Sequence, residues 1–531
     1  MTLPPPPEPL FPGESAYSTK RHQANLSDCE SEPIQTPGCI QSHGVLLVVG
    51  IPDGTILQVS ENSQEHLGLA PEALLGQPIG RVLTPAGAER LRIVLAKEPV
   101  ERNPIRLLSL PPRLGARSLD VSVHTIDGVA ILEFEPTGRI DGRPEPDFNG
   151  LVRNSILRLQ TAETVTDCWG VIVAEMRTIT GLDRVMLYRF HDDWHGEVVA
   201  EAKRDDLPSW LDLHYPAADI PASARAVFLQ IGLRPVPDAG RRLAELVPLV
   251  NPNTGRPLQM IHCYLRAPSG LYTEYLKNMG AAASLTMPIV RKGLLWGMIV
   301  CHHRRPTEFS YQLRAAAEFF ARVASLQSQA TEELAHLRLQ RRLEAIHNQL
   351  FLRVIEKNSL TALVADDSLL REDLAVGGAA LLLDGRWHRT GQTPTESQLG
   401  ELHRWLEDRP EFRSPLDPFY ASDALVKEFA AAAAYAELGA GLLAVPLAPS
   451  GGNVLCLFRP ENIRTIYWAG ATEEPTPSAD TPARALAPRT SFASIADTIR
   501  HRSAPWLRAE TDWMLRLRLL LTDPRQLSTA G

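Results

Sequence analysis

The feature that most constrains the fold is a long stretch, Tyr311–Lys357, that contains no glycine or proline. Apolar residues recur along it at steps of four, three and four, as in Leu339, Leu343, Ile346 and Leu350. At a rise of ~1.5 Å per residue, a helix of this length is on the order of 70 Å long, which exceeds the needs of one small domain. We therefore expect a helix that joins two domains and offers a face for dimerisation. A helix packed only on its own domain is the alternative.

The composition is that of an ordinary globular protein. Hydrophobic residues make up 44% of the 531 and charged residues 22%, which gives room for roughly three or four domains. The net charge of -8 and the pI near 6.0 argue against nucleic acid as a partner. The most apolar stretch, residues 429–448, is interrupted by Glu437, Gly439 and Pro446, so we expect no membrane span.

The start of the chain and its cysteines bear on its location. Residues 1–27 are proline-rich and lack a basic region followed by an apolar run, so we expect a flexible leader and no signal peptide. The cysteines lack the paired spacing of a metal site, which favours reduced thiols in a cytoplasmic protein. They are Cys29, Cys39, Cys168, Cys263, Cys301 and Cys456.

Periodicity on the N-terminal side of the long helix predicts two α+β units. The first has helical signals around residues 65–75 and strands at Val45–Val49, Ile56–Ser60, Leu119–Val123 and Val129–Phe134, a pattern typical of PAS sensor domains. A linker at 138–149 precedes the second unit. Its expected helices are Leu151–Thr178, Ala222–Leu229 and Thr273–Met279, and its expected strands are Arg184–Phe190, Ser284–Val290 and Leu294–His302. This alternation suits a GAF-type domain with a ligand cleft between sheet and loops.

A third unit is expected after the long helix. Its core strands are predicted at Ala379–Leu383, Gly441–Leu447 and Val454–Phe458, and its final helix at Trp506–Leu520. Between them, residues 466–506 are rich in Pro, Thr and Ala and lack sustained apolar periodicity. An insertion of this length in a compact domain is either functional or disordered.

One loop of the second unit has a distinctive sequence. In Tyr215–Pro221, Asp219 lies between Pro216 and Pro221, which restrict the backbone on both sides. A rigid loop of this kind can present a carboxylate to a bound group. On local chemistry alone, a surface turn with a solvated aspartate is the alternative.

This loop resembles the PASDIP loop of phytochromes, the bilin-binding red-light receptors. Other motifs resemble phytochrome segments in the same order: the attachment segment of bacteriophytochromes, the second half of the bilin-binding domain, and the hairpin called the tongue. They are Cys29–Ile34 with Pro37–Gly44, Glu274–Gly280 with Leu295–His303, and Pro488–Phe492. The resemblance implies a bacteriophytochrome photosensory core of α+β class, with three antiparallel-sheet domains: PAS at 28–140, GAF at 141–325 and PHY at 326–525, with the tongue at about 466–506.

The same resemblance assigns roles to single residues. Cys29 matches the cysteine that forms a thioether to the bilin vinyl group. Leu271 stands where plant and cyanobacterial relatives attach the pigment, which points to biliverdin here. Asp219 is implied to exchange hydrogen bonds with Arg489 in one state and Ser491 in the other. Residues matching propionate contacts are Arg234, Arg266, Ser269, Ser284 and Thr286; those matching the pocket of the rotating ring are Tyr188, Tyr215, Ile220, Phe228, Tyr275 and His302.

One position departs from the family pattern. Tyr272 stands where the family has a histidine that helps hold the water and proton network of the inner rings. A phenol with an ordinary pKa of about 10 is a poor proton relay at neutral pH. We therefore hypothesise that Tyr272 permits pigment binding but weakens or shortens the photoproduct.

The sequence indicates a signalling module without its own catalysis. His336 lacks the context of a phospho-accepting histidine and is expected to be an exposed helix residue. The chain is then either a fragment of a longer signalling protein, with a histidine kinase or other output, or acts through partners as a homodimer. The alternatives are a light-insensitive dimeric scaffold of the same fold, suggested by Tyr272, and a GAF sensor for a different small ligand.

Overall fold

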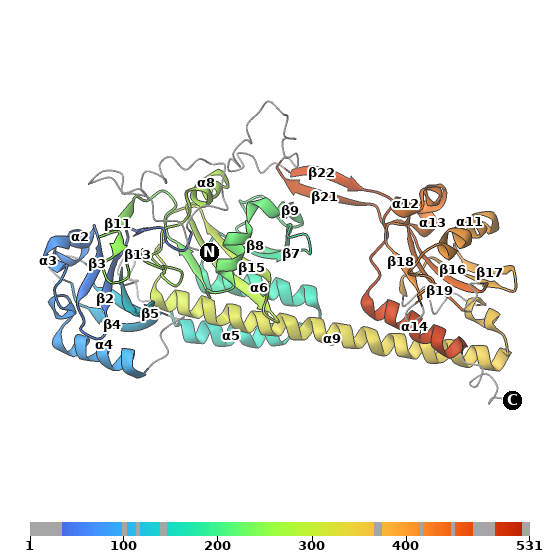
Figure 1. Cartoon of the computed structure of the whole chain (residues 1–531), viewed down its shortest axis with the longest axis horizontal. Helices are drawn as coiled ribbons and strands as arrows, with labels where there is room; N and C mark the ends of the chain where they lie inside the picture. Colours follow the sequence, from blue (N-terminus) through green and yellow to red (C-terminus); the bar gives the residue numbers. More distant parts are fainter. Residues whose placement is uncertain are drawn as a thin grey trace, which may run out of the picture. The chain divides into compact units, whose positions relative to one another are not determined.

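The computed structural model forms two compact units that share one long helix (Figure 1). One unit contains the residues before Ala330 together with a short segment from Tyr467, and the other contains the remainder. The shared helix is α9, Tyr311–Lys357, with the predicted bounds. The structure describes residues 34–97, 104–112, 117–137, 146–365, 374–414, 418–447, 452–470 and 494–522.

The first sheet of the N-terminal unit contains the predicted PAS-type strands. In the described residues its seven strands have the order β1-β11-β3-β2-β6-β5-β4. They are β1 Cys39–Gln41, β2 Val45–Gly50, β3 Ile56–Ser60, β4 Ile105–Leu110, β5 Leu119–Ile126, β6 Val129–Pro136 and β11 Leu243–Val247. The accompanying helices are α2 Ser63–Leu67, α3 Pro71–Leu74, η1 Ile79–Arg81 and α4 Pro85–Lys97. The helical signals expected around 65–75 are confirmed as two short helices, because Gly68 takes a left-handed conformation (φ 71°) that ends α2 before α3 begins.

The placement of β11 in this sheet was not predicted. β11 pairs antiparallel with β1 on one side and with β3 on the other, although it lies about two hundred residues further along the chain than β1. On its other side β1 contacts the segment around Arg266: the Gln41 N–H donates to the Leu265 carbonyl at 2.8 Å. The chain just before and within β1 is therefore held by residues of the second expected domain.

The second sheet carries the GAF-type strands. Its eight strands, counted over the described residues, have the order β10-β14-β15-β7-β8-β9-β21-β22. They are β7 Arg184–Phe190, β8 Gly196–Lys203, β9 Leu213–Tyr215, β10 Arg234–Val236, β14 Ala283–Arg291, β15 Leu294–His303, β21 Arg464–Ala469 and β22 Ser494–Ile499. A separate pair is β12 Val250–Asn251 with β13 Arg256–Pro257. The helices are α5 Phe148–Gln160, α6 Val165–Thr180, η2 Ala217–Asp219, α7 Ala222–Phe228 and α8 Gly270–Asn278.

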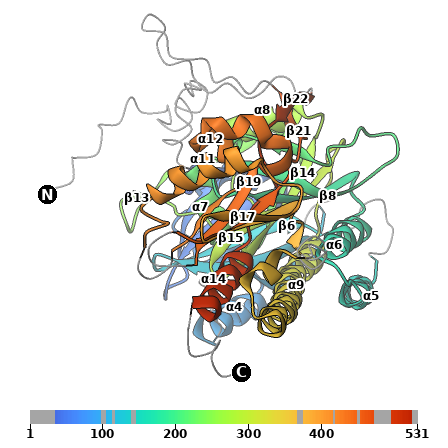
Figure 2. The ribbon, with the colours of Figure 1, turned by 90° about the vertical axis from the view of Figure 1, so that its right-hand side faces the viewer.

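The two faces of this sheet differ. Leu285, Ile299 and Cys301 face the core formed with α5, α6 and the first part of α9, which lie side by side in Figures 1 and 2. Because side chains alternate along a strand, the neighbouring residues Ser284 and His302 point to the opposite face, where loops and α7 and α8 lie. The single helix expected at Leu151–Thr178 is wrong: it divides into α5 and α6, and the Thr164 hydroxyl caps α6 by accepting from the Asp167 N–H at 3.1 Å.

The second unit contains one sheet between two hydrophobic cores. Among its described residues five strands have the order β17-β16-β20-β19-β18, and the three predicted core strands are confirmed as β16, β19 and β20. The strands are β16 Gly378–Leu383, β17 Arg386–Gly391, β18 Tyr420–Ser422, β19 Gly441–Pro446 and β20 Val454–Arg459. The helices are η3 Leu360–Val364, α11 Glu396–Glu407, α12 Leu425–Glu428, η4 Ala430–Tyr435, α13 Ala436–Gly439 and α14 Arg508–Thr522. Leu343, Ile346 and Leu350 of α9 pack in the core beside α14. No helix in the described ranges is long and apolar enough to cross a membrane.

Candidate functional site

The Asp219 loop is held by its prolines and by one arginine. Pro216 and Pro221 have extended backbone angles (ψ 155° and 161°) on either side of the single turn η2. The Arg225 guanidinium donates to the carbonyls of Ala217 and Ile220, which fixes the turn from inside the same loop. Arg225 was not among the predicted site residues, although its place four residues after Pro221 was visible in the sequence.

The side chain of Asp219 is directed to α8. Its Oδ2 accepts a hydrogen bond from the Tyr275 hydroxyl at 3.2 Å. Burial, reinforced by the neighbouring carboxylate, raises the pKa of Tyr275 well above its usual range, so the phenol stays protonated and remains a donor. Two motifs that lie far apart in the sequence therefore meet in one contact.

An aromatic cluster lies beside this loop, on the face of the sheet opposite the core formed with α5 and α6. The rings of Tyr188 and Tyr215 are buried, with centroids 5.8 Å apart. Ile220 and Phe228, which were both predicted to line the pocket of the rotating ring, pack against the same cluster. Gly196 makes this packing possible, because a Cβ there would lie 1.8 Å from the Tyr188 ring. The cluster also contains Met186 and Met298, which apolar periodicity alone did not distinguish from core residues.

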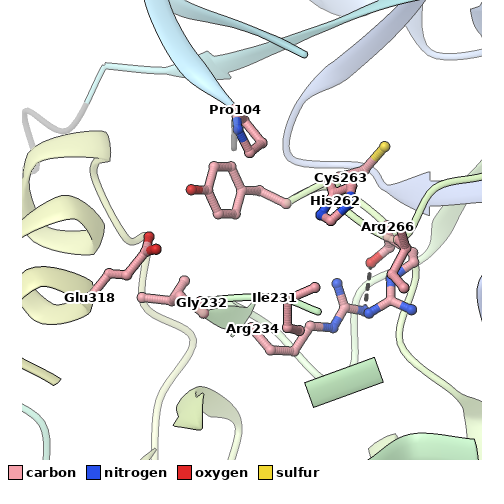
Figure 3. A pocket seen from close by; sticks show the side chains of 11 residues that line it. Pro104, Ile231, Gly232, Arg234, His262, Cys263, Arg266 and Glu318 are labelled. Carbon is pink, nitrogen blue, oxygen red and sulfur yellow. Dashed lines mark hydrogen bonds between the residues drawn. The ribbon is translucent and has the colours of Figure 1, made fainter. Parts of the chain in front are cut away.

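Two arginines, the half-buried Arg234 and the buried Arg266, lie at the β10 side of this face of the sheet. Arg234 Nη2 donates to the Arg266 carbonyl at 2.8 Å, as Figure 3 shows, and Arg266 Nη1 donates to the Ile34 carbonyl at 2.8 Å. Arg234 Nη1 and Arg266 Nε are buried and have no partner among the described residues. Burial and the charge of Arg266 lower the pKa of Arg234 well below its usual range, and burial lowers that of Arg266 to about 10. Both guanidinium groups would be stabilised by anions.

Hydroxyl groups and a histidine continue the same face. Strand pairing sets Arg234 opposite Thr286 and Ser284 opposite His302. The hydroxyls of Tyr272 and Ser284 are hydrogen-bonded at 2.9 Å. Burial, with the charge of Arg184, lowers the pKa of His302 to about 3, so its imidazole is neutral at physiological pH. Its buried Nδ1 has no partner in the part of the chain that the structure describes.

The remaining predicted residues differ in their positions. Ser269 precedes α8 as its N-cap residue, and its side chain makes no capping hydrogen bond. Cys29, Arg489 and Ser491 lie outside the described residues, so their roles stay predictions. His336 is exposed on α9, as expected, and Cys301 is a core residue.

Sequence reasoning also missed a buried polar group next to the arginines. Cys263, near Arg234 in Figure 3, has its Sγ 3.8 Å from His124 Nε2. The carboxylate of Glu133 accepts hydrogen bonds from the Tyr264 and Leu265 N–H groups, at 3.1 and 2.6 Å. Because these residues are far apart in the sequence, their spacing gave no signal. Glu133 anchors the segment that leads into Arg266.

Comparison with known proteins identifies the family. Three family models match in order along the chain: the PAS fold at residues 29–137, the GAF domain at 166–327 and the Phytochrome region at 343–529. Cyanobacterial phytochrome B of Nostoc sp. is 34% identical over 93% of this chain, which spans 66% of that protein's length. The bacteriophytochrome of Xanthomonas campestris pv. campestris is 31% identical over 95% of this chain and 79% of its own length.

Solved structures agree. The bacteriophytochrome RpBphP3 from the photosynthetic bacterium R. palustris is 36% identical with a TM-score of 0.79, over 93% of this chain and 98% of that one. The phytochrome photosensory core module of Stigmatella aurantiaca is 33% identical with a TM-score of 0.75, over 94% and 98%. The chain therefore belongs to the phytochrome family of light receptors and has the PAS, GAF and PHY domains of a phytochrome photosensory core.

Proposed function

We propose that this chain is a red/far-red photoreceptor that binds biliverdin covalently through Cys29 and relays the light signal through its tongue to an output. When bound, biliverdin would supply the absorption of light and the isomerisation of a double bond. The residues of the chain bind and orient it, exclude water from it, and respond to the rotated ring.

The observation that carries the proposal is a pair of neighbouring arginines. Arg234 and Arg266 hold N–H groups that are buried without partners among the described residues, and both line one small pocket beside β10. Guanidinium groups suit carboxylates because they donate two parallel hydrogen bonds. A ligand with two carboxylate arms and an apolar body would suit this face of the sheet, since Tyr188, Tyr215 and Phe228 form an apolar cluster further along it. His302, with a buried nitrogen free to bond, would contact the terminal ring.

Chain length supports Cys29 as the attachment residue. The carbonyl of Ile34 accepts a hydrogen bond from Arg266, so the chain next to Cys29 is anchored at the arginine end of the cleft. Five residues span at most ~17 Å even when fully extended. The thiol therefore stays within reach of a ligand bound by Arg266. Addition of a thiol to a vinyl group requires access and orientation but no catalytic triad.

The relay is proposed to run through Asp219. Its carboxylate lies at the end of a rigid turn and already accepts one hydrogen bond from Tyr275. We expect its carboxylate to bind Arg489 in one state and Ser491 in the other. A ring rotation that displaces Tyr188 or the neighbouring Tyr215 would alter the loop that begins at Tyr215 and thereby the partner of Asp219.

A second candidate is a light-insensitive dimeric scaffold of the same fold. The Tyr272–Ser284 hydrogen bond favours it, because that phenol is tied to a neutral partner. In both cases the chain is not proposed to be an enzyme, and its output would come from a further domain or from a partner protein.

The test is assembly of the purified chain with biliverdin. We expect a coloured adduct whose absorbance changes after red light and which gives a zinc-fluorescent band on a denaturing gel. Cys29→Ser should abolish the band, and Cys39→Ser, the matched control ten residues away, should retain it. A coloured but unresponsive protein would favour the scaffold, and a colourless one would end the proposal.

A further inference from the structure

Three histidines outside the proposed bilin contacts converge at one end of the second sheet. His191 follows β7, His195 precedes β8, and His214 belongs to β9. One ring nitrogen of each lies within 4.8 Å of those of the other two. The rings of His191 and His195 are stacked with centroids 4.1 Å apart, and the centroid of His214 lies 5.9 and 5.3 Å from theirs.

A carboxylate contacts one ring nitrogen in each of two of these histidines. His191 Nε2 lies 2.9 Å from Glu197 Oε2, and His195 Nδ1 is hydrogen-bonded to Asp193. In metalloproteins a carboxylate on the second nitrogen fixes the ring and makes the first nitrogen a better ligand. This arrangement leaves His191 Nδ1 and His195 Nε2 for a ligand.

His214 supplies the third donor. Its Nδ1 is buried and has no hydrogen-bond partner within the described ranges. Strand pairing aligns His214 with Glu197, which places it directly across from the turn that carries the other two histidines. A buried imidazole nitrogen without a partner is costly unless something binds it.

We propose that His191, His195 and His214 bind one divalent transition-metal ion of the zinc or nickel type. Imidazole is a preferred donor for these metals, whereas Mg²⁺ and Ca²⁺ prefer oxygen. At metal–nitrogen distances of ~2.0–2.1 Å the three nitrogens must approach to ~3.5 Å. Because the rings of His191 and His195 are stacked with an angle of 6° between their planes, one of the two must also turn so that both nitrogens point at the same ion. Three protein ligands leave one coordination position open to water.

Metal binding at this site would also stabilise the pairing of β21, at the base of the predicted tongue, with β9. Trp468 of β21 lies against His195 and His214, with ring centroids 5.6 Å from each, and β21 pairs in parallel with β9 so that Trp468 is aligned with His214. A metal that fixes both imidazoles would give Trp468 a rigid surface. We therefore expect metal binding to slow the opening of β21 from β9.

Equilibrium dialysis of the chelator-treated full chain against Zn²⁺, and separately against Ni²⁺, with the bound metal measured by mass spectrometry, tests the proposal. We expect one ion per chain. The double variant His191→Gln/His214→Gln should lose it, and Glu197→Gln should weaken binding by ~10- to 100-fold. His336→Gln, which removes an exposed histidine on α9, should bind as the wild type does.

Hydrogen exchange and the stoichiometry of binding give two further tests of the metal site. Hydrogen exchange at residues 467–469 should slow when Zn²⁺ is added to the wild type and stay unchanged in the double variant. Absence of stoichiometric binding, or equal binding by the double variant, would overturn the proposal. The measurement is made on the chain with and without biliverdin, so its outcome is independent of whether the pigment binds.

Discussion

At the residue scale, two neighbouring arginines of like charge define the chemistry of the candidate site, because each has a buried N–H group. Arg234 and Arg266 are close enough for one to donate to the backbone of the other, and burial lowers the pKa of both. Such a pair is unfavourable in a pocket without anions. The cost of removing water from these guanidinium groups is therefore met when the protein folds. We infer that an anionic ligand binds more tightly for this reason, because these side chains are already desolvated.

Tyr272 is predicted to limit the photochemistry. Its hydroxyl is bonded to Ser284, and burial raises its pKa, so it holds its proton at neutral pH. Tyr272→His should increase the photoconverted fraction and form the photoproduct ~10-fold faster or more, since a well-placed proton-transfer group contributes ~10²–10⁴ in rate. Flash photolysis of the biliverdin adduct measures this, with Tyr272→Phe as the control that restores no relay. Equal kinetics in all three proteins would contradict the hypothesis.

Glu133 is predicted to make stability depend on pH. Burial, together with the charge of Glu135, raises its pKa from 4.5 to about 8. Between these values the folded chain holds a proton that the unfolded chain releases, so stability falls as pH rises through this window. Relative to Glu133→Gln, the wild type should lose up to ~1.4 kcal/mol per pH unit from about pH 5 to 8. Urea unfolding at several pH values measures this, and the exposed control Glu72→Gln should follow the wild type.

Motifs predicted the site better than periodicity did at this scale. Asp219 and Tyr275 belong to separate motifs, and their hydrogen bond shows that the two motifs are in contact, while their roles in a site stay predictions. His214 and Trp468 gave no such signal, because their proximity depends on the pairing of β9 with β21. Glu133 was missed for the same reason: a carboxylate that binds a distant backbone has no local pattern.

At the scale of elements, the sequence predicted the strands and the long helix, but it did not predict where one helix ends and the next begins. α9 and β7 have the expected bounds because continuous apolar periodicity determines them. The break between α5 and α6 depends on Thr164 as a capping residue, a local signal that the apolar pattern obscured. β21 and β22 were expected only as part of the tongue hairpin that the resemblance implies, since their residues lack alternation and pair with one another and with β9.

The strand β21 is predicted to be held largely by one side chain. Trp468 packs on two histidine rings, whereas its neighbour Tyr467 is 44% exposed. Trp468→Ala should lower the local stability by ~1–2 kcal/mol, because ring contacts and buried area are both lost. Hydrogen exchange at residues 467–469 should then be ~5- to 30-fold faster. Tyr467→Ala is the matched control, and a similar acceleration there would show that the strand is held by its backbone instead.

At the scale of the whole molecule, an exposed apolar surface predicts self-association. Phe319 and Leu326 lie seven residues apart on α9 and are 55% and 72% exposed, and Leu157 on α5 is 57% exposed. α5 and α9 also line a groove with Val152 and Ile156. Exposed residues at this spacing are typical of helices that pair with a second copy.

Substitution of this surface tests the dimer. Phe319→Glu and Leu326→Glu should each raise the dimer Kd by ~10- to 100-fold, since each removes an apolar side chain whose burial in the dimer would contribute ~1.5–3 kcal/mol. Sedimentation velocity over a range of concentrations measures this. Leu294→Glu, at a 70% exposed position on β15, is the control. A wild type that remains monomeric at high concentration would contradict the prediction.

The strand order of the first sheet has a consequence for biosynthesis. β1 finds its strand partner in β11, so a nascent chain has no place for its first strand until the ribosome has passed Val247. The thiol proposed to capture the pigment lies just upstream of β1, and it would be presented only by molecules in which both halves had assembled. Covalent pigment would then mark correctly folded molecules, because only a chain in which β1 has paired with β11 would hold the thiol near the pigment.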